Sequence, residues 1–170
     1  MTNPLQGGRG RPLHPALAHF PVALYPASLL FDWLSYLAAD GTPYVKGAYA
    51  LIVAALVVAV PVAITGVADF LAIESGSRAW RLAFTHLTVM LATSGLFLAS
   101  AILRRRDLDV TSTPFGLVLL DAFAVALLVF GVVLGHDLVF RYGRRVEAPP
   151  PAPASQEQQA QGLGPDLSRH

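Results

Sequence analysis

The sequence contains no cysteine, and this absence limits the chemistry available to the chain. Disulfide bonds, thiolate metal sites, iron–sulfur clusters and covalent c-type haem attachment all require cysteine, so they are excluded for this chain alone. Charge is also scarce, because only 14% of the residues are Asp, Glu, Lys or Arg and the formal net charge is +1. So weak a charge, confined to short connecting segments, gives no reason to expect nucleic acid as a partner. Any metal site must use His, Asp or Glu.

Hydrophobic residues are abundant instead, at 54% of the 170 residues, and the mean hydropathy is +0.54. Both values lie outside the usual range of soluble domains. Four apolar segments account for them, and each is long enough to cross about 30 Å of hydrocarbon; they cover residues 15–39, 47–73, 79–103 and 115–140. We therefore predict an all-α polytopic membrane protein, a four-transmembrane-helix bundle in contact with the lipid bilayer.

The segments outside the spans divide the chain and predict its orientation. Residues 1–12 form an N-terminal segment, 13–146 the transmembrane domain, and 147–170 a Pro- and Gln-rich tail that we expect to be disordered. Four spans place both termini on one side, which carries most of the basic residues: Arg9, Arg11, Arg78, Arg81, Arg141, Arg144 and Arg145. The other side carries Lys46 and the run 104–106. By the positive-inside rule, both termini are predicted to be cytoplasmic.

Each span contributes one ionisable residue at the same predicted depth, about 7 to 8 Å inside the terminal-side interface; the four are His19, Asp69, His86 and His136. Intramembrane charges cost about 2.5–3.5 kcal/mol each, so such residues usually face the bundle interior and one another. Three imidazoles and a carboxylate suit haem b or a single metal ion, Fe or Zn. For haem we predict His19 and His86 as the ligand pair, with His136 and Asp69 supporting them. For a bare ion, all four would be ligands.

Three other polar residues are interpreted separately. His14 precedes His19 by five residues, which turns the helix face by about 140°, so we assign His14 to the helix start or an entrance. Asp32 and Asp121 lie near the opposite membrane face, and we expect them to pair with arginines of the run 104–106. A proton path across the bundle is the alternative role for these two carboxylates.

Small residues within the spans indicate close helix packing. Gly131 and Gly135 form a Gly-x-x-x-Gly motif in the fourth span, of the kind that lets helix backbones approach in lipid. We favour packing within the four-helix bundle over homodimerisation, although a homo-oligomer stays an open possibility.

The motifs as a set resemble the bacterial membrane family called domain of unknown function 2231. The resemblance rests on HPALAHFPVALYPASLLFDWL at 14–34, GVADF at 66–70, the segment around His86, and GHDLVFRYGRRV at 135–146. It implies a bacterial inner-membrane protein, and relatives joined to Rieske or cytochrome-like domains imply electron transfer with a redox partner. The closing motif departs from the family pattern at His136, which weakens the case for that residue as an obligatory ligand.

These observations lead to one functional hypothesis and two alternatives. The leading hypothesis is a module that binds haem b or a metal ion near the cytoplasmic face and passes electrons to or from a redox protein. The alternatives are a non-catalytic scaffold, in which the polar layer only joins helices by hydrogen bonds, and a small transporter or channel subunit. No catalytic residue is predicted, because the sequence has no nucleophile motif, phosphate loop or HExxH element.

Overall fold

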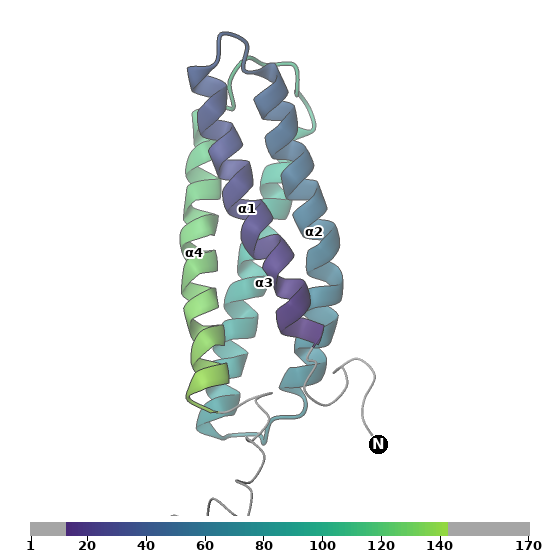
Figure 1. The fold of residues 1–170 in the computed structure, drawn as a ribbon, viewed down its shortest axis with the longest axis vertical. Coiled ribbons are helices and arrows are strands. Elements are labelled where there is room, and N and C mark those ends of the chain that lie inside the picture. Colours follow the sequence, from purple (N-terminus) through teal and green to yellow (C-terminus); the bar gives the residue numbers. More distant parts are fainter. Residues whose placement is uncertain (1–12, 143–170) are drawn as a thin grey trace, which may run out of the picture.

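The protein forms four antiparallel helices in a computed structural model that describes residues 13–142. They are α1 (Leu13–Leu37), α2 (Thr42–Phe70), α3 (Arg78–Arg104) and α4 (Phe115–Phe140), and they run alternately up and down one bundle (Figure 1). The predicted all-α four-helix bundle is confirmed. The N-terminal segment 1–12 and the predicted disordered tail 147–170 lie outside the described residues.

Local chemistry explains where the helices begin. Pro43 lies in the first turn of α2, where a missing amide hydrogen costs nothing, so this helix begins five residues before the predicted span at 47. The Asp40 carboxylate accepts a hydrogen bond from the Thr42 N–H over 3.0 Å just ahead of that turn. Ser77 caps α3, because its side-chain oxygen accepts the Trp80 N–H at 3.0 Å.

The bundle consists of two helical hairpins that meet along a narrow core. α1 packs mainly against α2, and α3 packs mainly against α4. Between the hairpins the rings of Tyr25 and Phe97 stack in parallel, with centroids 4.0 Å apart. The other fully packed core residues are apolar and mostly small at this level: Ile52, Ala55, Ala101, Ala124 and Leu128.

The outer surface of the bundle is apolar, as expected for contact with lipid. The apolar side chains of Val57 and Phe123, for example, expose 66% and 62% of their area, respectively. The helices α2, α3 and α4 are each long and apolar enough to cross a membrane. α1 has a similar length, but two histidines, three prolines, two serines and an aspartate lower its hydropathy below that of the other three.

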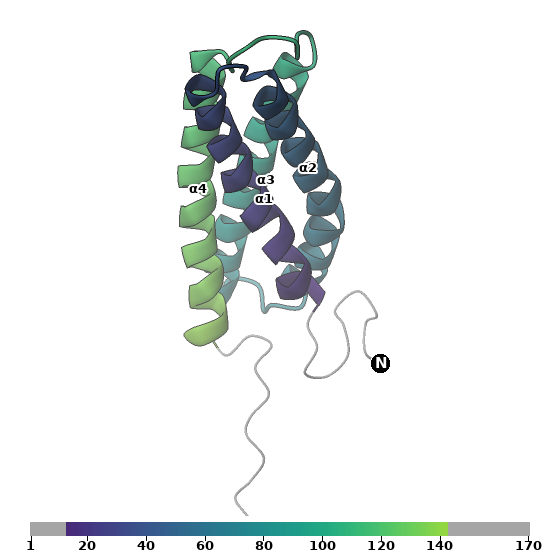
Figure 2. The same cartoon turned by 45° about the horizontal axis from the view of Figure 1, so that its top comes forward.

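The loops divide the bundle into two ends. The α1–α2 and α3–α4 loops lie together at one end, and the α2–α3 loop lies at the other, where α1 begins and α4 ends (Figures 1 and 2). The buried charged residues Asp32, Arg104 and Asp121 lie toward the first of these ends, and the half-buried His14 and His86 lie toward the second.

Candidate functional site

Two histidines from different hairpins lie close together at the end of the bundle where α1 begins. The imidazole centroids of His14 on α1 and His86 on α3 are 6.4 Å apart, and the ring planes are nearly perpendicular at 88°. Both side chains are half-buried.

Each imidazole is fixed by a backbone carbonyl of the neighbouring helix in its own hairpin. Nδ1 of His14 lies 2.9 Å from the Val62 carbonyl oxygen, and Nδ1 of His86 lies 2.8 Å from that of Gly131. A carbonyl oxygen can only accept, so the neutral ring carries its proton on Nδ1 and donates it. Each Nε2 is then left with a lone pair. Histidines that bind metals usually have this arrangement, because the bond from the second nitrogen fixes both the tautomer and the ring orientation.

A glycine makes room for each ring. Gly66 lies one helical turn after Val62, and a Cβ at this position would be 2.9 Å from Cε1 of His14. Gly135 lies one turn after Gly131, and its Cβ would be 3.0 Å from Cε1 of His86. Real Cβ atoms are rarely so close to another carbon, so both contacts depend on glycine. Gly135 therefore serves packing within the bundle, as the Gly-x-x-x-Gly motif predicts.

The two hairpins repeat the same pattern beyond the histidines. Inward-facing residues of α1 have counterparts on α3 that lie 72 positions later in the sequence, as Arg104 does relative to Asp32. The corresponding pairs are His14 with His86, Tyr25 with Phe97, Ser28 with Ser100, and Asp32 with Arg104. The His14–His86 pair and the Tyr25–Phe97 stack therefore join equivalent positions of the two hairpins.

The structure does not bring the four predicted ligands together. His19 and His136 are exposed, with Nδ1 of His19 3.4 Å from the Ala16 carbonyl oxygen and His136 against the ring of Phe140. Asp69 is half-buried near the end of α2. Across residues 13–142, no group of three or more His, Cys, Asp or Glu side chains is placed to hold a metal ion.

His14 lies in the first turn of α1, as predicted, and its ring lies beside His86, where the sequence places His19. The 140° between their faces is correct, but α1 turns the His14 face inward. The buried positions of α1 after His14 are Pro21, Tyr25, Ser28, Asp32 and Ser35, spaced three or four residues apart. Continuing this spacing backward from Asp32 leads to His14 and passes over His19, so the sequence contains a signal that His14 and not His19 faces the interior.

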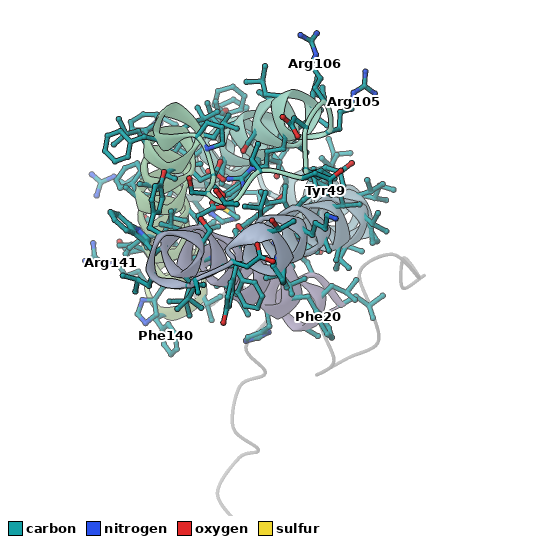
Figure 3. All side chains as sticks on the ribbon, turned by 90° about the horizontal axis from the view of Figure 1, so that it is seen from above. Phe20, Tyr49, Arg105, Arg106, Phe140 and Arg141 are labelled. Carbon is teal, nitrogen blue, oxygen red and sulfur yellow. The ribbon has the colours of Figure 1, made fainter. Side chains whose placement is uncertain are left out.

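A second polar cluster lies inside the opposite end of the bundle. Nη1 and Nη2 of Arg104 donate to Oδ1 and Oδ2 of Asp32 at 2.6 Å each, and Nη2 also reaches Oδ2 of Asp121 at 2.5 Å. The predicted pairing of both aspartates with the arginine run is thus confirmed, and Arg104 alone provides it. Arg105 and Arg106 point away from the bundle (Figure 3).

The α3–α4 loop closes over this cluster. The Thr113 hydroxyl donates to Oδ1 of Asp32 at 2.8 Å, and its N–H donates to Oγ of Ser35 at 3.1 Å. The Tyr36 hydroxyl donates to the Thr113 carbonyl. Asp32, Arg104, Asp121 and Thr113 all expose 3% of their area or less, so the cluster is sealed from solvent.

A family described as "Predicted membrane protein (DUF2231)" matches residues 10–148, which includes every described helix. No curated protein and no solved structure matches the chain.

Proposed function

The chain belongs to the DUF2231 family of predicted membrane proteins, and on that premise we propose that it binds haem b between α1 and α3 and transfers electrons within the membrane. The ligands in this proposal are Nε2 of His14 and Nε2 of His86. The observation that carries it is the double anchoring of the imidazoles, in which each Nδ1 donates to a backbone carbonyl and each Nε2 keeps its lone pair.

The donor set fits haem better than a bare ion. Two imidazoles suffice for haem, because the porphyrin supplies the remaining four nitrogens to the iron. A protein zinc site normally needs three or four side-chain ligands, and residues 13–142 offer no such group. A bare Fe or Zn ion at this pair would therefore need ligands from outside the described part of the chain. Metal–imidazole bonds are about 2.0–2.1 Å long. The ring centroids of His14 and His86 are 6.4 Å apart, which leaves room for one metal atom bonded to both rings.

Bound haem would supply reversible one-electron chemistry at its iron, and the protein's own residues would set its position. The Val62 and Gly131 carbonyls hold the two rings, while Gly66 and Gly135 leave the space that the rings occupy. A carbonyl accepting from Nδ1–H also makes the opposite nitrogen a better electron donor. The site would lie at the end of the bundle where α1 begins and α4 ends, which the arginine distribution predicts to be the cytoplasmic side.

The alternative is a scaffold in which the same contacts only hold helices together. It is favoured by the fact that both histidines already bond across a helix–helix interface through Nδ1. Interhelical hydrogen bonds in membranes contribute about 0.6 kcal/mol on average, so loss of either ring would then change stability and nothing else.

Optical spectroscopy with metal analysis separates the two functions. We would purify the full chain in detergent and record oxidised and dithionite-reduced spectra of the wild type, His14→Ala and His86→Ala. The proposal predicts a Soret band with reducible α and β bands in the wild type, lost in both variants. His19→Ala and His136→Ala are matched controls, because both residues are exposed and should leave the spectrum unchanged. A folded, colourless and metal-free wild type would contradict the proposal and favour the scaffold.

The predicted orientation has its own test. Fusion of a reporter that is active only in the cytoplasm to residue 170 should give signal if the termini are cytoplasmic. Signal only from a reporter that works outside the cytoplasm would reverse the orientation and move the histidine pair to the other face of the membrane.

A further inference from the structure

The buried cluster at the other end of the bundle has one cation and two carboxyl groups. Arg104 donates through Nε to Oγ of Ser100 at 3.0 Å, and through its two terminal nitrogens to Asp32 and Asp121. The two carboxyl side chains are completely inaccessible to solvent, and the arginine side chain is 1% exposed. If both carboxyl groups were ionised, the cluster would carry a net charge of −1 with no contact to water.

No other described helix supplies the missing positive charge. α1 contributes Asp32, α3 contributes Arg104, and α4 contributes Asp121 itself. The charged residues of α2 are Lys46, which is exposed and paired with Asp109 at 2.6 Å, and Asp69 at the far end of the bundle.

The two carboxyl groups differ in their hydrogen bonds. Asp32 accepts from Arg104 at both oxygens and also from the Thr113 hydroxyl, so all its bonds stabilise the ionised form. Asp121 accepts from Arg104 at Oδ2 only, and its Oδ1 has no hydrogen-bond partner within residues 13–142. An ionised oxygen buried without a partner is costly, and it is the one that would gain most from neutralisation.

We propose that Asp121 binds an exchangeable proton, so that the Asp32–Arg104–Asp121 cluster is a proton-binding site inside the bundle. One proton on Asp121 makes the cluster neutral and leaves the Asp32–Arg104 pair intact. A metal cation is a poorer occupant, because hard cations such as Ca²⁺ require about six oxygen ligands and the cluster leaves only one carboxyl oxygen unpaired. The site does not involve the histidine pair, so it stands whether or not the protein binds haem.

The loop over the cluster is the route by which the proton would exchange. Thr113 covers Asp32, and it is held there by its bonds to Asp32, Ser35 and Tyr36. Opening these three bonds would expose the cluster without separating the helices, so exchange with water would take place at this end of the bundle.

Infrared spectroscopy of the full chain in lipid tests the proposal directly. A protonated carboxyl group absorbs above the amide band, and exposed aspartates are ionised at neutral pH and do not contribute there. We expect a carboxylic-acid band in the wild type at neutral pH that shifts in D₂O and is lost as the pH is raised. Absence of this band at neutral and mildly acidic pH, or a band whose loss depends on added NaCl in place of pH, would overturn the proposal.

Two variants assign the band and test the charge count. Asp121→Asn keeps an oxygen for Arg104 and mimics the neutral carboxyl, so we expect it to remove the band and leave the unfolding midpoint unchanged. Asp32→Asn is the matched control, because it takes an ionised partner from a buried arginine and should lower the midpoint. If Asp121→Asn lowers the midpoint as far as Asp32→Asn does, Asp121 is ionised in the native state and the proposal is wrong.

Discussion

Replacing Gly135 with alanine would place a methyl group against the imidazole of His86. The new Cβ would lie 3.0 Å from Cε1 and 3.3 Å from Nδ1 of that ring. Carbon atoms in ordinary contact are about 3.5–4.0 Å apart, so the ring would have to move by about 0.5 Å or more. Its bond to the Gly131 carbonyl, 2.8 Å long, would be stretched by that movement.

Two opposing effects determine the magnitude. Overpacking of this kind costs about 1–3 kcal/mol, whereas alanine within a helix is favoured over glycine by about 0.8–1.0 kcal/mol. We therefore expect Gly135→Ala to lower the free energy of unfolding by about 0–2 kcal/mol. Gly95 on α3 is the matched control, because a Cβ there would meet nothing within 4 Å and only the helix preference remains. Gly95→Ala should raise stability by up to about 1 kcal/mol.

The assay is reversible unfolding by SDS in mixed micelles, followed by far-UV circular dichroism. The expected result is a difference of about 1–3 kcal/mol between the two alanine variants, with Gly135→Ala the less stable. Equal stabilisation by both substitutions would show that His86 does not pack against Gly135, and it would remove the basis for treating that ring as fixed.

Three further predictions concern the helix ends and the loop over the buried cluster. Ser77→Ala removes the oxygen that accepts the Trp80 N–H and should lower the free energy of unfolding by about 1 kcal/mol in the same SDS titration. The Thr42 N–H bonds to Asp40 and holds the pKa of that carboxyl below its usual range, so its contribution is fully present above about pH 3.9 and is lost as the pH falls through the lower native pKa. Asp40→Asn should therefore remove part of the acid slope of stability measured against pH, and an unchanged slope would contradict this. Tyr36→Phe removes the hydroxyl that donates to the Thr113 carbonyl. Loss of a hydrogen bond that contributes about 1 kcal/mol should speed hydrogen exchange at the Thr113 amide about fivefold. An unchanged exchange rate would mean that this bond does not hold the loop.

The sequence predicts how far along the bundle a residue lies better than it predicts whether its side chain faces the interior. Helix length and the rise per residue place His19, His86 and His136 toward the correct end, because distance along a helix depends only on counting residues. Direction depends on which neighbours a helix packs against, and those neighbours come from distant parts of the chain. His86 lies on the inner face of α3, while His19 and His136 do not lie on the inner faces of α1 and α4.

The aspartate–arginine cluster was predictable because its chemistry leaves few alternatives. Buried carboxyl groups at the depth of an arginine run need a cation, and the sequence offers that run and little else. Which arginine provides it follows from helix geometry, since Arg104 ends α3 with its side chain inward while Arg105 and Arg106 follow it into the loop. The orphaned Oδ1 of Asp121 could be found only in the structure, because it depends on the exact position of one guanidinium group.

The most direct test of the central claim, that His14 and His86 form one cofactor site, is a haemin titration of the purified apoprotein. Saturation at one haem per chain with a six-coordinate, low-spin spectrum is the predicted result, and His86→Ala and His14→Ala should each lose one axial ligand or all binding. His136→Ala should titrate like the wild type. Absence of saturable binding, or equal binding by all four proteins, would contradict the claim and leave the two histidines as links between helices.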